Sequence, residues 1–138
     1  MKKLLPTLKI IAAMGTGIAA EAHGVVVAPV ISTDHTWTGQ PITLPQNHPW
    51  ITVSTYDIPA GALLPEHKHP YPRYGYVIAG TLQVTSTTMS KTAEFKAGDF
   101  IAESVGQWHH AVNPGTEETR LLVIDVTPDD PKNTIFEH

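Results

Sequence analysis

The chain has 138 residues, which fits one compact domain and is too short for two ordinary ones. It carries 9 basic and 13 acidic residues, a formal net charge of −4, and the scattered cationic side chains form no basic stripe. This distribution argues against nucleic acid as a partner. There is no cysteine, so disulfides, thiolate metal ligands and a cysteine nucleophile are excluded, and any metal must be held by nitrogen and oxygen.

The first 22 residues have the three parts of a secretory signal peptide. Residues 1–9 hold three lysines and no acid, residues 10–18 are largely apolar, and Ala20-Glu21-Ala22 is a small-x-small cleavage site. The alternative is an apolar N-terminal helix or membrane anchor, but the apolar run is far below the ~20 residues of a spanning helix, so no stable membrane span is expected. The pattern predicts export to the periplasm, with cleavage near Ala22 and a mature domain over residues 23–138.

The rest of the chain shows the pattern of short β-strands. Proline and glycine recur at short intervals, and the segments between them are rich in valine, isoleucine, threonine and aromatics. No segment has a helical period. Strands are expected at residues 25–31, 50–58, 74–79, 82–86, 92–95, 100–103, 109–112 and 119–126. Many short strands predict an all-β sandwich or small barrel.

Turns and loops separate these strands. Gly80 and Gly98 lie in segments that are too short for anything but tight turns. Residues 33–49 are expected to form a loop or edge hairpin. The tail from Pro128 onward holds two acids and a second proline, and is expected to be extended and exposed.

Two histidines, His67 and His69, stand one residue apart in an extended segment. Side chains of a strand alternate between faces, so both imidazoles point to the same side and together make half of a metal site. Glu66 is adjacent to His67, and the same alternation turns its carboxylate away from the pair. A third ligand must come from elsewhere in the chain.

Two stretches, residues 61–80 and 98–113, resemble the two signature motifs of the cupin family. The first matches the family spacing at Gly61, His67, His69 and Gly80, with Arg73 in the glutamate position, and the second matches at Gly98, Gly106, His109 and Asn113, with Ser104 in place of a proline. The resemblance covers about residues 49–126. It implies a small antiparallel jelly-roll β-barrel.

The resemblance also implies a ligand set. Metal-binding cupins hold iron, manganese, nickel, copper or zinc with three histidines and one glutamate, which implies His67, His69 and His109 as ligands here. His110 must point away from the face of His109. Arg73 has no lone pair to donate, so it cannot replace the glutamate, and its positive charge would weaken the binding of a cation.

Three interpretations of Arg73 stay open at the level of sequence. In the first, the three histidines hold a metal for a dioxygenase, and Arg73 with its neighbour Tyr74 binds a small anionic organic substrate. In the second, the pocket is metal-free, and the protein is a non-catalytic module that binds a small ligand or anion. In the third, Arg73 only pairs with Glu66 or Glu103. The sequence identifies no catalytic residue.

The termini suggest two further expectations. Cupins commonly dimerise through edge strands, and the extended segments 25–31 and 127–138 are available for a homodimer. Cleavage after Ala22 would make His23 the first residue of the mature chain, where an α-amino group and its own imidazole can chelate copper. The cupin resemblance favours the three-histidine site over this second idea.

Overall fold

The computed structural model describes residues 9–13, 17–22 and 24–138, and the chain divides into two units, residues 1–33 and residues 34–138. In the first unit β1 (Lys9–Ala13), β2 (Gly17–Ala22) and β3 (Val25–Val27) form an antiparallel sheet. The strand expected over residues 25–31 is therefore shorter. The charged start of the predicted signal peptide and His23 lie outside the described residues. No helix within the described ranges is long and apolar enough to cross a membrane.

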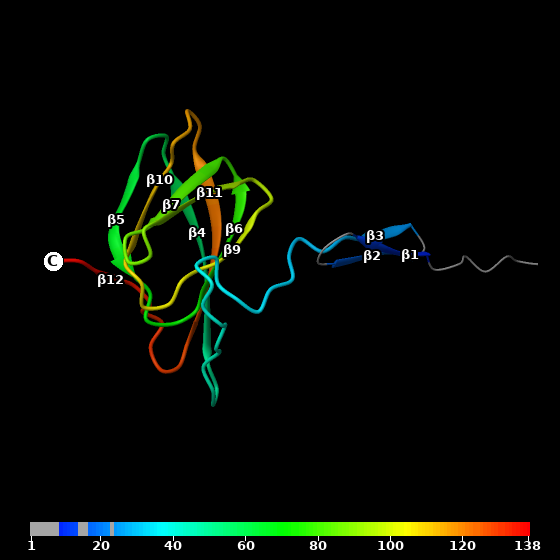
Figure 1. The fold of residues 1–138 in the computed structure, drawn as a ribbon, viewed down its shortest axis with the longest axis horizontal. Helices are drawn as coiled ribbons and strands as arrows, with labels where there is room; N and C mark the ends of the chain where they lie inside the picture. The colour runs from blue at the N-terminus through cyan, green and yellow to red at the C-terminus, as the bar shows by residue number, and fades with distance from the viewer. Residues whose placement is uncertain (1–8, 14–16, 23) are drawn as a thin grey trace, which may run out of the picture. The chain divides into compact units, whose positions relative to one another are not determined.

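The second unit is a jelly roll of two facing antiparallel sheets (Figure 1). The four-stranded sheet has the order β4 (Trp50–Ile58), β11 (Thr119–Thr127), β6 (Arg73–Ala79) and β9 (Phe100–Ala102). The five-stranded sheet has the order β12 (Ile135–Phe136), β5 (Leu63–Lys68), β10 (His109–Val112), β7 (Thr81–Ser86) and β8 (Lys91–Lys96). The predicted all-β antiparallel fold is confirmed.

Strand alternation places the core between the two sheets. In β11, Leu121 and Val123 are buried, and in β7, Leu82 and Val84 are buried, while the residues between them are more exposed. Eight buried apolar side chains form one cluster: Ile58, Val77, Leu82, Val84, Ile101, Ala111, Leu121 and Val123. Burial of this set between the sheets is the main source of stability.

The turn between β6 and β7 requires glycine. Gly80 has a φ of 80°, in the left-handed region, and a Cβ atom there would lie 2.4 Å from Oγ1 of Thr119. Thr119 is fully buried and accepts the N–H of Thr81, which fixes this turn against β11. Gly98, in the second turn expected from the sequence, also has a positive φ value, as do Gly61 and Gly106 of the two cupin-like motifs.

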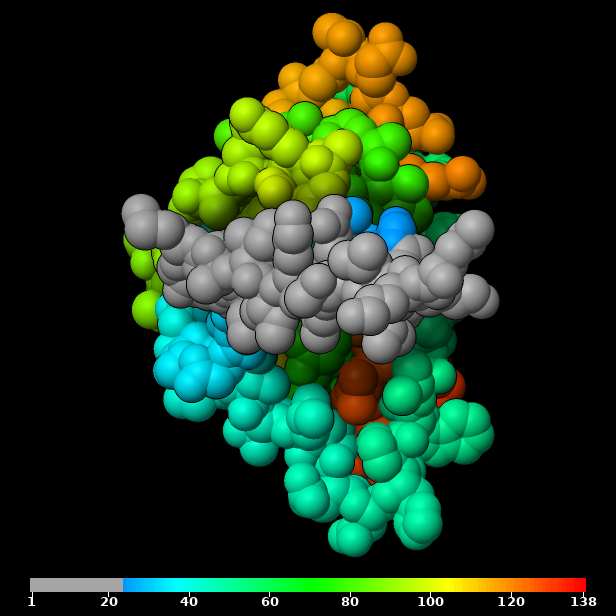
Figure 2. Space-filling view, turned by 90° about the vertical axis from the view of Figure 1, so that its right-hand side faces the viewer, coloured from blue at the N-terminus to red at the C-terminus, as the bar shows by residue number. Residues whose placement is uncertain are grey.

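The loop between β10 and β11 lies at one end of this unit, and the segment that leads into β4 lies at the other (Figure 2). The metal-ligating candidates lie between these ends, where β5 and β10 face β6 and β9. Paired strands hold each of them at a fixed register.

The expectation of an exposed C-terminal tail is wrong in part. Residues 128–132 are largely exposed, but Asn133 is buried, and β12 adds to the edge of the five-stranded sheet by pairing with β5. Proline and acidic residues in the tail indicated a loop, and a two-residue strand that pairs with a segment more than 60 residues away has no local signal.

Candidate metal centre

The structure brings the three predicted histidines together inside the jelly roll. His67 lies in β5, His69 directly follows that strand, and His109 begins β10 opposite His67 in the register. All three are buried, and each offers a ligand atom within 4.8 Å of the others. The alternation argument for His67 and His69 is therefore correct.

Backbone carbonyl groups fix the orientation of all three imidazoles. Nδ1 of His67 donates to the carbonyl oxygen of Pro65 at 2.6 Å, Nδ1 of His69 to that of Asn133 at 2.7 Å, and Nδ1 of His109 to that of Gln107 at 2.9 Å. A proton on Nδ1 leaves the lone pair of Nε2 free. Metal-binding histidines commonly have this tautomer, with the proton on the other ring nitrogen donated to a carbonyl or carboxylate oxygen.

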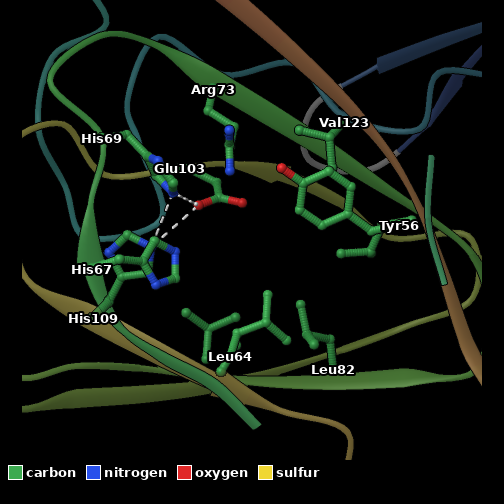
Figure 3. Close-up of a pocket in the computed structure, with 12 residues that line it drawn as sticks. Tyr56, Leu64, His67, His69, Arg73, Leu82, Glu103, His109 and Val123 are labelled. Atoms are coloured by element: carbon green, nitrogen blue, oxygen red, sulfur yellow. Dashed lines mark hydrogen bonds and ion pairs between the residues drawn. The ribbon is translucent and has the colours of Figure 1, made fainter. Parts of the chain in front are cut away.

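Glu103 contacts two of the three histidines from the neighbouring strand end. It follows β9, and its Oε2 atom lies 3.2 Å from Nε2 of His69 and 3.5 Å from Nε2 of His109, which are themselves 3.2 Å apart (Figure 3). Atoms that each bind one ion at about 2.0–2.1 Å lie about 3 Å apart. The spacing of these nitrogen and oxygen atoms therefore fits a single metal ion.

The protonation states of this cluster follow from burial and from Glu103. Burial lowers the pKa of His67 to about 4 and keeps this imidazole neutral at pH 7. Burial opposes ionisation of Glu103, but hydrogen bonds with His109 and His69 outweigh it and hold the pKa of the carboxyl well below its usual range. Burial also opposes a charge on His109, but the bond with Glu103 raises the pKa of His109 above its ordinary value. In the metal-free protein, a proton on Nε2 of His109 is donated to the acceptor atoms that face it, Oε2 of Glu103 and Nε2 of His69.

Metal uptake is therefore expected to release a proton near pH 6. The raised pKa of His109 keeps the metal-free imidazole protonated at that pH, and a metal can bind Nε2 only after the proton leaves. Release should approach about one proton per metal below pH 6.5 and fall toward zero as the pH rises through the pKa of His109. Titration calorimetry in buffers of different ionisation enthalpy measures this number.

Glu103→Gln removes the carboxylate that raises the pKa of His109, so this variant should release fewer protons per metal than the wild type at the same pH. Equal release from both proteins would show that Glu103 does not control the proton on His109.

Arg73 is turned toward a different acid from those expected. Its Nε and Nη2 atoms donate to the two carboxylate oxygens of Asp125 at 2.7 and 3.0 Å, and both side chains are less than a tenth exposed. The pairing with Glu66 or Glu103 considered from the sequence is wrong. Asp125 balances the arginine's charge, which removes much of the repulsion between Arg73 and a bound cation.

Two adjoining cavities lie beside this cluster. The smaller, of about 20 Å³, is large enough for one water or ion, and is lined by the three histidines, Glu103, Arg73 and Tyr56 together with six apolar residues of the core. The larger, of about 330 Å³, is lined by seven residues: Tyr56, Leu64, Pro65, His67, Arg73, Thr134 and Phe136. Its volume lies at the lower end of the range for small-molecule sites.

Other candidates from the sequence lie outside these cavities. Tyr74, predicted with Arg73 as a substrate-binding residue, belongs to the opposite face of β6, where its ring stacks on Phe100. It lines neither cavity beside His67. Glu66 turns outward, as expected, and accepts hydrogen bonds from His110 and Thr87.

A family model for the cupin domain matches residues 54–125, slightly more than half of the chain. The chain belongs to the cupin family. No curated protein matches this cupin significantly in sequence. Among solved structures it is similar to a double-stranded β-helix protein from Klebsiella pneumoniae, with 22% identity over 86% of this chain and 100% of that one, at a TM-score of 0.52.

Two further solved structures share the fold at similarly low identity. The polyketide cyclase RemF from Streptomyces resistomycificus is 20% identical over 64% of this chain and 62% of that chain, with a TM-score of 0.54. An oxalate oxidase is 24% identical over 62% of this chain, with a TM-score of 0.53, and this cupin spans only 45% of that chain. These likenesses show the fold alone.

The family assignment gives Glu103 a particular meaning. The carboxylate that the family pattern has at the position of Arg73 is here within reach of the histidines from the adjacent strand end. The N–H of Glu103 donates to the carbonyl oxygen of Arg73 at 2.9 Å, so the two residues are direct neighbours across the sheet. The amino-acid sequence did not point to Glu103 as a candidate ligand, because the cupin motif has no ligand at this position.

Proposed function

We propose that this cupin is an exported, metal-dependent oxygenase that acts on a small anionic organic molecule, with His67, His69, His109 and Glu103 as metal ligands. One observation carries the metal site: His69, His109 and Glu103 direct nitrogen and oxygen atoms to one point, where a metal ion can take the place of the proton on His109. A redox metal bound there would supply oxygen activation. Export rests on the charge and hydropathy pattern of residues 1–22.

The larger cavity supports a small substrate with one polar end. Arg73 and Thr134 line one part, while Leu64, Pro65 and Phe136 line an apolar part. Asp125 engages Nε and Nη2 of Arg73, and none of the hydrogen bonds among the described residues engages Nη1. The N–H groups of Nη1 are therefore available for a carboxylate of the substrate.

The test combines metal analysis with oxygen uptake on protein purified without an affinity tag. We expect close to one transition metal per chain, and oxygen consumption with at least one member of a panel of small carboxylic acids. Less than about a tenth of an equivalent of metal, even after loading, would contradict the metal site. A full metal site without oxygen consumption would favour the alternative, a non-catalytic module that binds a small ligand.

Replacing Arg73 with lysine is expected to weaken carboxylate binding at least about tenfold, because an ammonium keeps the charge but cannot pair with both oxygens of Asp125 and also present the two N–H groups of Nη1 to the ligand. Titration calorimetry of the metal-loaded protein with the carboxylate panel measures this. The surface substitution Arg120→Lys is the control, since Arg120 makes a similar pair with Asp57 far from the cavity. Equal carboxylate affinity in Arg73→Lys and in the wild type would contradict the role of Nη1.

A further inference from the structure

The C-terminal segment 133–136 lies beside β5, the strand that carries His67 (Figure 1). β12 pairs with β5 so that Ile135 faces Lys68 and Phe136 faces His67. Asn133, immediately before this strand, is only 3% exposed although the preceding residues are on the surface. A buried amide at the end of an exposed loop must find hydrogen-bond partners, and those partners show what the segment does.

Asn133 joins the metal centre to the acid that holds Arg73. The backbone carbonyl oxygen of Asn133 accepts the Nδ1–H of His69 at 2.7 Å, and its side-chain Nδ2 donates to Oδ1 of Asp125 at 2.7 Å. The side chain also closes a ring with Tyr71, accepting the Tyr71 N–H at 2.9 Å and donating to the Tyr71 carbonyl oxygen at 3.0 Å. The amide side chain therefore holds the backbone carbonyl that orients His69.

The next residues extend the same segment along the substrate cavity. Oγ1 of Thr134 accepts from Nη2 of Arg73 at 3.3 Å, and the Phe136 ring lies 6.1 Å from the ring of His67. Both side chains line the cavity of about 330 Å³. One short segment thus contacts His67 and His69 and also Arg73.

We propose that Asn133 is a positioning residue of the metal centre, and that docking of segment 133–136 and metal binding stabilise each other. The proposal rests on the metal site inferred above. Without the side-chain anchor, the Asn133 carbonyl is free to move from Nδ1 of His69, and the imidazole loses the bond that fixes its tautomer and orientation. Reciprocal coupling follows, because anything that favours the docked segment favours the ligand geometry.

Cobalt(II) titration of the full chain tests the positioning role. Asn133→Ala is expected to lower cobalt affinity by about 10- to 100-fold and to alter the visible absorption bands, which report ligand geometry. Asn113→Ala is the matched control. Asn113 is also a buried amide, bonded to the carbonyl oxygens of Ile58 and Glu117, but it contacts neither the histidines nor Arg73. This control should lose thermal stability while keeping its cobalt affinity within about threefold.

Limited trypsin digestion of the wild type tests the coupling without any substitution. Lys132 is exposed and precedes Asn133, so cleavage after it requires the segment to undock. Saturating cobalt is expected to slow this cleavage at least about tenfold, with a much smaller effect after Lys96, an exposed lysine on the edge strand β8.

The outcomes separate the two proposals. If the wild type binds no cobalt, the proposed metal site fails. If the wild type binds cobalt but Asn133→Ala binds it equally well, or Asn113→Ala loses as much affinity, the positioning role is overturned and the metal site stands. Equal cleavage after Lys132 with and without bound cobalt would likewise overturn the coupling.

Discussion

Replacing Arg73 with alanine is expected to lower the free energy of unfolding by about 3–5 kcal/mol, because it leaves the buried carboxylate of Asp125 without its ion partner. Asp125 is 5% exposed, and among the described residues its carboxylate would keep only the side-chain amide of Asn133 as a hydrogen-bond donor. Chemical denaturation of the metal-free protein measures the loss, without a contribution from bound metal.

The chain contains a matched control on its surface. Arg120 donates to both carboxylate oxygens of Asp57 at 2.7 and 3.2 Å, nearly the geometry of the Arg73 pair, but these two side chains are about half exposed. Arg120→Ala should therefore destabilise the protein far less than Arg73→Ala, because solvent screens the exposed pair. If both substitutions lower the free energy of unfolding equally, burial does not set the contribution of Arg73 to stability. The role of Arg73 as the counter-charge of buried Asp125 would then be wrong.

Glu103→Ala is expected to lower the affinity for a transition metal by at least about 100-fold, because it removes a negatively charged group that binds the metal itself and not only a hydrogen bond to one of the ligands. Its Oε2 atom lies within 3.5 Å of the Nε2 atoms of His69 and His109, and no other carboxylate among the described residues forms an ion pair with these two histidines. Competition with a chromophoric chelator measures the affinity of the wild type and of the variant.

Glu66→Ala is the control for Glu103. Glu66 is adjacent to a ligand in sequence, but its carboxylate bonds to His110 and Thr87 on the outer face of the sheet. Removing it should change the metal affinity by less than about threefold, since it affects the site only through a screened charge. A larger loss from Glu66→Ala than from Glu103→Ala would show that the fourth ligand has been misassigned.

Much of the fold was predictable from local patterns. Strand alternation and turn residues gave the bounds of β4 and β10 as the structure has them and those of β6, β7, β8, β9 and β11 to within a residue. The same alternation put His67 and His69 on one face. These features depend on the period of two along a strand and on positive φ at glycine, which a single sequence records directly.

The residues that the sequence did not reveal act through contacts between distant segments. Asp125 lies two and four positions after Val123 and Leu121 in β11, so its side chain points to the same buried face. An acid on that face indicated that a group of opposite charge must be buried beside it. The contacts of Glu103 and Asn133 depend on which strand ends meet, and local propensity does not specify that. The partner of Arg73 could therefore be identified only from the way the strands pair in the structure.

The most direct test of the four-ligand centre is an anomalous-diffraction map of crystals of the full chain loaded with one transition metal. We predict a single strong peak inside the jelly roll, about 2.0–2.2 Å from Nε2 of His67, His69 and His109 and from a carboxylate oxygen of Glu103, with Arg73 still paired to Asp125. A metal bound by the histidines with the Glu103 carboxylate turned away, or no peak at this position, would contradict it.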